Sequence, residues 1–107
     1  MNKETRLQNE IRASVNDIAV TFRANVGLFF TKDGRPVSTG LPSGFCDLFG
    51  FRKSDGEIFF IEVKTKNGKP TKQQKNFISA MQAHGVRAGI ARSVEDARRI
   101  IESDPAN

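Results

Sequence analysis

The chain has 107 residues, of which 17 are Lys or Arg and 12 are Asp or Glu, so its formal net charge is +5. This length allows one compact domain, and the basic balance points to a polyanionic partner. A single cysteine excludes an internal disulfide and a zinc site built on several thiolates. No apolar run approaches the roughly 20 residues that cross a bilayer, and no apolar segment of the signal-peptide type follows the charged N-terminal residues. We therefore expect a basic, cytoplasmic protein that makes no membrane contact.

The N-terminal part predicts a helix followed by extended segments. Apolar residues recur at helical spacing over residues 3–18. Residues 20–31 are rich in Val and Phe and predict one strand, or two short strands around Gly27. Residues 32–36 contain Asp-Gly and Pro and predict a turn after this extended region.

Two strands joined by a tight turn come next. They cover residues 45–51 and 57–63, and the Ser54-Asp55-Gly56 segment between them is a strong hairpin signal. The second strand is apolar on both faces apart from Glu62, so we expect it in the centre of a sheet. Because strand residues alternate between the two faces of a sheet, we also expect two phenylalanine pairs to be core residues: Phe29-Phe30 and Phe59-Phe60.

The C-terminal part predicts a helix, a strand and a second helix. Thr71-x-x-Gln74 has the form of a capping box, and it starts a helix that we expect to end at Gly85. Residues 86–91 predict a strand, and Ser93 starts the last helix, followed by a frayed tail from about residue 103. The order of elements predicts a single domain over residues 1–107: a small α/β sandwich with a central mixed sheet flanked by helices.

Glu62 is the first candidate for a functional residue, because a carboxylate in a buried strand is costly unless it is compensated. Lys64 follows two residues later and points to the same face. The hairpin brings Asp47 to this face as well, either opposite Lys64 or, in a register closer by one pair, directly opposite Glu62. Two close carboxylates repel each other unless a proton or a cation lies between them, and oxygen ligands suit Mg²⁺ or Mn²⁺. A structural Lys–Glu pair beside a surface acid is the alternative.

Other residues extend this candidate site. Glu4 falls near the centre of the apolar face of the first helix, whereas Glu10 falls roughly 100° away, so Glu4 is the better inward-pointing acid. A favourable acid in the first helical turn is the alternative interpretation of Glu4. Gln74 caps its helix, directs its amide into the cleft, or does both. The basic residues beside the acids are a solvated surface or contacts for DNA phosphates: Lys64, Lys66, Lys69, Lys72 and Lys75, with Arg23 and Asn25 as further contacts.

Asp47 followed by Glu62-Val63-Lys64 resembles the D…E-x-K core of the PD-(D/E)xK nucleases. The surrounding sequence is similar to the VRR-NUC domain, and most similar to its stand-alone, phage-encoded versions. The usual Pro before the Asp is Cys46 here, a change that concerns the backbone rather than the chemistry. The segments that carry the resemblance are Gly40-Leu41-Pro42-Ser43-Gly44-Phe45-Cys46-Asp47-Leu48, Phe60-Ile61-Glu62-Val63-Lys64-Thr65, Thr71-x-x-Gln74, Gly85, Glu4-x-x-x-Gln8 and Arg23-x-Asn25-x-Gly27.

The resemblance implies a restriction-endonuclease-like fold and an Mg²⁺-dependent endodeoxyribonuclease, in which Mn²⁺ can substitute. Its implied substrate is branched or double-stranded DNA, in particular four-way (Holliday) junctions, and its implied assembly is a homodimer. The alternatives are a nicking, flap or end-processing repair nuclease, or a module that binds nucleic acid without cleaving it.

The resemblance also implies roles for individual residues. Lys64 would position or activate the attacking water, and Gln74 would support the site. The implied metal ligands are Asp47, Glu62, the carbonyl of Val63, and Glu4 with Glu10 as the fallback.

Overall fold

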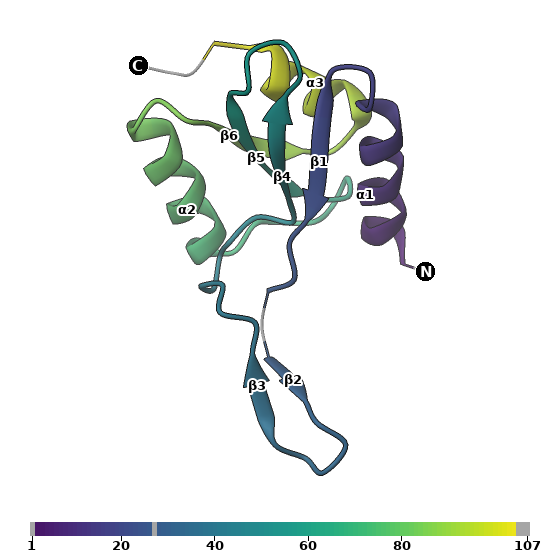
Figure 1. Cartoon of the computed structure of the whole chain (residues 1–107), viewed down its shortest axis with the longest axis vertical. Coiled ribbons are helices and arrows are strands. Elements are labelled where there is room, and N and C mark those ends of the chain that lie inside the picture. Colours follow the sequence, from purple (N-terminus) through teal and green to yellow (C-terminus); the bar gives the residue numbers. More distant parts are fainter. Residues whose placement is uncertain (1, 27, 105–107) are drawn as a thin grey trace.

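A four-stranded mixed sheet forms the centre of the protein, which the computed structural model describes over residues 2–26 and 28–104. The strand order is β1-β4-β5-β6, with β6 parallel to β5 and the other neighbours antiparallel (Figure 1). Two further strands, β2 and β3, form a separate small sheet. The strands are β1 (Ala19–Arg23), β2 (Leu28–Phe30), β3 (Pro36–Ser38), β4 (Leu48–Arg52), β5 (Ile58–Val63) and β6 (Arg87–Ala91). The helices are α1 (Lys3–Ser14), α2 (Lys72–Ala83) and α3 (Val94–Glu102).

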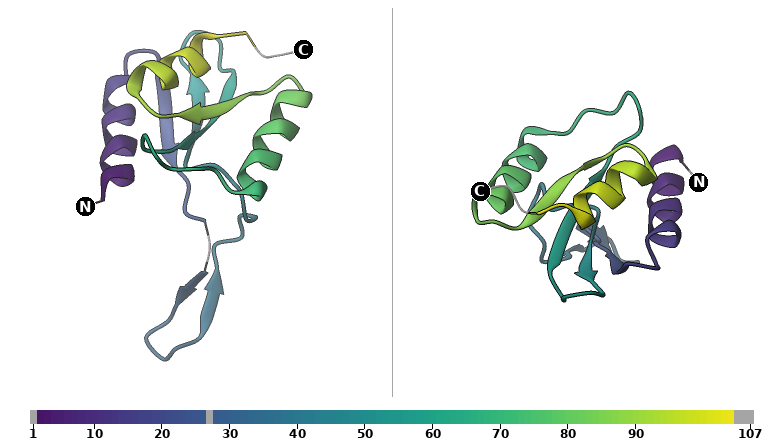
Figure 2. Two further views of the ribbon diagram at one scale, coloured as in Figure 1. Left: turned by 180° about the vertical axis from the view of Figure 1, so that it is seen from behind. Right: turned by 90° about the horizontal axis from the view of Figure 1, so that it is seen from above.

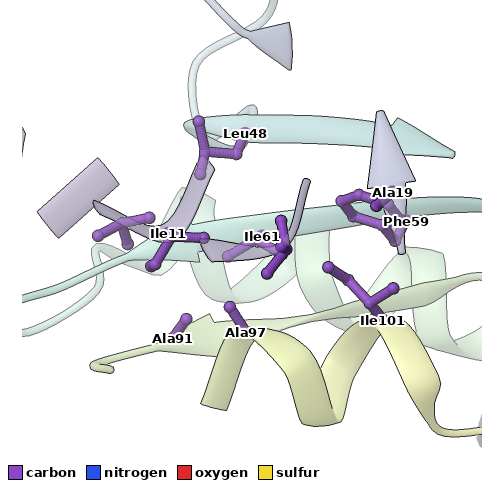
Figure 3. Packing of buried hydrophobic residues seen from close by; sticks show 10 residues of the cluster. Ile11, Ala19, Leu48, Phe59, Ile61, Ala91, Ala97 and Ile101 are labelled. Atoms are coloured by element: carbon purple, nitrogen blue, oxygen red, sulfur yellow. The ribbon is translucent and has the colours of Figure 1, made fainter. Parts of the chain in front are cut away.

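The helices cover the central sheet on both faces, which confirms the predicted α/β sandwich (Figures 1 and 2). The main core lies between the sheet and the helices α1 and α3. Figure 3 shows Ile11 of α1 and Ile101 of α3 directed toward Phe59 and Ile61 of β5. These four side chains are at most 1% exposed, so their burial supplies a large hydrophobic term. Within the described residues, no helix has the length and apolar character that a membrane span requires.

The opposite face of the sheet carries an aromatic cluster beneath α2. Phe60 points to this face because it alternates with the fully buried Phe59. Its ring packs edge-on against Phe77 of α2, with 5.4 Å between the centroids, and Phe45 packs against both rings. Glu62 lies on the same face of β5 as Phe60, so this cluster holds α2 over the candidate site.

Helix α1 ends at Ser14 instead of continuing to residue 18 as predicted. The chain turns there, and the carbonyl of Val15 accepts hydrogen bonds from the amides of Ile18 and Ala19, both at 3.0 Å. Val15 is fully buried and Ile18 packs against the core. The apolar pattern therefore continues through a turn that redirects the chain into β1.

Strand β4 begins at Leu48, later than the predicted start at residue 45. The physical reason lies at Asp47, whose carboxylate accepts the amide of Val63 at 2.9 Å. A side chain thereby takes the place of a strand carbonyl, and the backbone ladder stops at this point. The predicted turn at residues 54–56 is confirmed, and it joins β4 to β5.

The largest departure from the sequence prediction is the β2–β3 hairpin, which projects from the body (Figures 1 and 2). The two-strand alternative is correct, but β3 was not predicted. The prediction that Phe29 and Phe30 lie in the core is wrong, since they are 58% and 70% exposed. Strand β2 pairs with β3 instead of joining the central sheet. Its side chains still alternate between two faces, but neither face of the hairpin packs against the core. The expected break at Gly27 and the tail residues 105–107 lie outside the described residues.

Candidate active site

Asp47 and Glu62 lie opposite each other at one end of the central sheet. The β4–β5 register, continued by one residue beyond Leu48, places Asp47 opposite Glu62, which is the closer of the two registers considered above. Two backbone groups fix Asp47: its carboxylate accepts the amide of Val63 at 2.9 Å, and its carbonyl accepts the amide of Ala24 at 2.8 Å. Asp47 therefore ties the ends of β1 and β5 to the start of β4.

Glu62 is 1% exposed, and its buried carboxylate has only some of the hydrogen-bond and charge partners that it needs. Its Oε1 accepts a hydrogen bond from Nε2 of Gln74 at 3.0 Å and lies 3.9 Å from Nζ of Lys64. Its Oε2 is buried without a hydrogen-bond donor among the described residues. Burial, followed by the proximity of the Asp47 carboxyl, raises the pKa of Glu62 to about 9, while Lys64 acts in the opposite direction. The two carboxyls therefore need a proton or a cation between them.

The donor set at this point fits a hard divalent cation. Asp47 and Glu62 offer carboxylate oxygens, including the unsatisfied Oε2. The amide of Val63 faces Asp47, and its carbonyl lies on the same side because a strand residue directs both groups to one neighbour. In residues 2–26 and 28–104, no three His, Cys, Asp or Glu side chains form a cluster that could hold a metal ion. The carbonyl and water would complete the coordination shell, as is common for Mg²⁺.

Gln74 caps its helix and also forms a hydrogen bond with Glu62. It closes the predicted capping box. Its side-chain Oε1 accepts a hydrogen bond from the backbone amide of Thr71 at 2.9 Å, and its backbone amide donates to the Thr71 hydroxyl at 3.1 Å. The remaining polar group of its side chain, Nε2, donates to Glu62. The start of α2 is thus linked directly to the buried carboxylate of β5.

Gly44 allows α2 to approach the loop that leads to Asp47. Its φ is +89°, and a Cβ at this position would lie 2.5 Å from the carbonyl oxygen of Gln73. Only glycine avoids both the left-handed strain and the collision with backbone atoms. The loop and the first turn of α2 therefore hold Asp47 and Gln74 on the same side of the site.

A cleft of 370 Å³ opens in front of Asp47. Glu4 of α1 lines it, whereas Glu10 is exposed and is not among the lining residues. The negative charge of Glu4 contributes to the raised pKa of Glu62. The structure therefore brings Glu4, rather than the fallback Glu10, to the site, although Glu4 does not complete a cluster of three metal-binding acids.

Gln8 is a cleft residue that was not predicted to belong to the site. It lines the cleft beside Glu4, is 6% exposed, and its Oε1 is buried without a hydrogen-bond donor among the described residues. A buried unsatisfied amide oxygen costs stability, so its position has to be explained by something other than packing. The signal in the sequence was its spacing of one helical turn from Glu4 on the same face.

Two of the predicted DNA-binding residues line this cleft. Arg23 and Asn25 are exposed and line it. Lys64 is 12% exposed and lies inside the site. The four other predicted lysines are all exposed: Lys66, Lys69, Lys72 and Lys75.

Arg92 shapes the loop that follows β5, a function that the sequence did not indicate. Its Nη1 donates to the carbonyls of Thr65 and Gly68, both at 2.7 Å. A third, longer contact of 3.4 Å reaches the carbonyl of Lys66. One guanidinium therefore holds the backbone that presents Lys66 next to the site.

Cys46, which replaces the usual proline, is buried beside Asp47. It is 1% exposed, and its thiol donates to the carbonyl of Leu48 at 2.9 Å. Burial raises the pKa of this thiol to about 12. The group stays protonated at neutral pH and acts as a packing residue instead of a nucleophile or metal ligand.

The comparisons with known proteins agree with this geometry. The family model of the VRR-NUC domain matches residues 28–95, a range that includes Asp47, Glu62, Lys64 and Gln74 but not Glu4. A solved structure described as a VRR_NUC domain has a TM-score of 0.68 and 23% sequence identity, and the match covers 95% of this chain and 97% of that chain. No curated protein matches the chain. The chain therefore belongs to the VRR-NUC domain family, fits the PD-(D/E)xK superfamily, and is a nuclease that acts on DNA.

Proposed function

We propose that the protein is a metal-dependent, structure-selective endonuclease that hydrolyses phosphodiester bonds in branched DNA, above all four-way junctions, as a homodimer. The observation that carries this proposal is the Asp47–Glu62 pair with its unsatisfied Oε2 and the raised pKa of Glu62. A purely structural ion pair does not account for it, because the lysine nitrogen is 3.9 Å away and reaches only Oε1. A carboxyl whose pKa is strongly raised by burial and by a neighbouring carboxyl is typical of functional sites.

The chemistry follows from the positions of these side chains. Asp47, Glu62 and the Val63 carbonyl would hold Mg²⁺ or Mn²⁺, which neutralises phosphate charge and lowers the pKa of a bound water. Lys64 keeps its ammonium inside the site, where it orients the attacking water or stabilises charge that develops on the phosphate. Gln74 holds Oε1 of Glu62, so this carboxylate keeps Oε2 directed away from its protein donors.

The exposed basic residues support a DNA substrate. The exposed lysines and Arg23 offer sequence-independent contacts to phosphates, which predicts affinity that falls steeply as salt is added. One chain supplies one Asp47–Glu62–Lys64 site. Paired cuts in a junction with two-fold symmetry need two such sites in a symmetric arrangement, which favours a homodimer.

A cleavage assay tests this proposal on a labelled four-way junction, a replication fork, a flap and a linear duplex, each with Mg²⁺, Mn²⁺ or EDTA. We expect paired symmetric cuts in the junction that require the metal, and a loss of at least about 100-fold in Lys64→Ala. Lys53→Ala removes an exposed lysine at the far end of the β4–β5 hairpin and serves as the matched control. Sedimentation of the wild type measures the assembly directly.

The other outcomes identify the alternatives. Cuts in flaps or at ends alone would keep the nuclease and reject junction resolution. Salt-sensitive binding without cleavage in either metal would make the protein a binding module. If the protein sediments as a monomer and still makes paired cuts, only the proposed homodimer would be rejected.

A further inference from the structure

The β2–β3 hairpin presents phenylalanine rings to solvent on both of its faces. Phe29 pairs with Val37, and Phe30 pairs with Pro36, so the two rings lie on opposite faces. Phe29 is 58% exposed, Phe30 is 70% exposed and Val37 is 48% exposed. Exposed aromatic surface on an element that projects from the body indicates a contact with another molecule (Figure 1).

Only one of these two rings belongs to the candidate active site. Phe29 lines the cleft that also contains Asp47 and Glu4, whereas Phe30 is not among the lining residues. Arg23, the last residue of β1, and Asn25, which follows this strand, line the same cleft. A flat apolar ring and groups that bind phosphates are therefore presented together beside the acids.

We propose that Phe29 stacks on a base face that is uncovered at a DNA branch point, so that this ring selects branched DNA over continuous duplex. The inference rests on the proposed function and specifies which feature of the substrate the site reads. In a continuous duplex both faces of each base pair are covered by neighbours, whereas a branch exposes terminal faces to an aromatic side chain. Lys32, exposed in the same hairpin, suits a flanking phosphate, whereas the guanidinium of Arg35 pairs with Asp33 at 3.1 Å.

The hairpin alone is too small to form a complete interface with a second copy of the chain. Strands β2 and β3 have three residues each, whereas a specific protein interface buries on the order of 1,200 Å² or more. Phe29 and Asp47 line the same cleft, so DNA bound at Asp47 would pass close to the ring.

Two matched variants test the proposal: Phe29→Ala and Phe30→Ala, which each remove an exposed ring from the same strand. On a four-way junction we expect kcat/KM to fall about tenfold or more in Phe29→Ala, with less than a twofold change on linear duplex. Phe30→Ala should stay within twofold of the wild type on both substrates. In EDTA, the wild type and Phe30→Ala should change the fluorescence of 2-aminopurine placed at the branch point, and Phe29→Ala should not.

The outcomes separate this inference from the proposed function. Equal losses on junction and duplex, or an unchanged fluorescence signal in Phe29→Ala, would overturn the inference while cleavage of the junction by the wild type upholds the function. If the wild type cleaves no DNA, the proposed function fails, and the fluorescence experiment in EDTA still decides whether Phe29 stacks on a base. A wild-type dimer that becomes a monomer in Phe29→Ala would assign the ring to a protein interface and overturn the inference.

Discussion

The side chain of Gln74 joins the first turn of α2 to the buried carboxylate of Glu62. Its Nε2 donates to Oε1 of Glu62 at 3.0 Å, while its Oε1 accepts the amide of Thr71 at 2.9 Å. One amide thus completes a helix cap and orients a candidate metal ligand. Its contributions to stability and to activity can be separated because Thr71 shares only the cap.

Gln74→Ala should lower both stability and the rate of DNA cleavage. It removes one bond of the capping box and the donor to Glu62, so we expect a loss of about 1 kcal/mol in unfolding free energy and a fall of about tenfold in kcat. Thr71→Ala, the control, should lose a similar stability and keep kcat within about twofold. Urea unfolding and single-turnover cleavage measure the two effects. Equal losses of kcat in both variants would show that the cap alone matters.

Gly44→Ala should destabilise the protein more than alanine at another glycine of the same loop. Its Cβ would collide with the backbone of Gln73 at 2.5 Å, in addition to the strain of a positive φ, so we expect a loss of about 3 kcal/mol. Gly40 also has a positive φ, +87°, but open space around it, so Gly40→Ala should cost only about 1 kcal/mol. Urea denaturation compares the two variants. Similar losses would contradict the close packing of α2 against this loop.

The metal-free protein should lose stability as the pH rises toward 9. The pKa of Glu62 is raised to about 9 in the folded protein and returns to its ordinary value near 4.5 on unfolding, so the folded state holds the extra proton between these values. The stabilisation is complete below pH 4.5 and disappears as the pH passes 9. Unfolding free energies in EDTA from pH 5 to 9 measure it. Glu62→Gln removes the titrating group, and parallel profiles for the variant and the wild type would contradict the prediction.

Arg92→Lys should loosen the loop after β5 although it keeps the charge. An ammonium does not reproduce the guanidinium geometry that reaches the carbonyls of Thr65 and Gly68, so we expect a loss of about 1–2 kcal/mol. Hydrogen exchange of residues 65–68 should become faster. Arg99→Lys, in which the replaced guanidinium is exposed and pairs with Asp96, is the control and should change stability by less than about 0.5 kcal/mol. Unchanged exchange in Arg92→Lys would assign the loop order to other contacts.

The sequence was sufficient to predict the central hairpin and its acids, because strand alternation and an Asp-Gly turn are local signals. It could not choose the register, since both turn lengths bring Asp47 to the face of Glu62. That choice depends on the Val63 amide, which the Asp47 carboxylate binds. Local signals of this kind also identify the start of α2 at Thr71, where the capping box involves only neighbouring residues.

The failures have a common physical cause, which is dependence on contacts distant in the sequence. Alternation at Phe29 and Phe30 correctly indicates a strand, but it cannot show that this strand leaves the central sheet. The pattern around Arg92 is that of a helix start, whereas its partners lie in the loop after β5. The spacing of Gln8 from Glu4 indicates a shared helix face, but the burial of Gln8 against the cleft depends on the packing of α1.

The buried thiol of Cys46, next to Asp47, provides a probe for local opening of the protein. The chain has no Trp or Tyr and a single cysteine, so ordinary near-ultraviolet probes are weak and thiol labelling has one target. Cys46 is 1% exposed and its pKa is raised to about 12, so a thiol reagent has to wait until the surrounding strands separate. The rate of labelling therefore measures how often the segment that carries Asp47 opens, and a divalent cation bound at the proposed site should slow it.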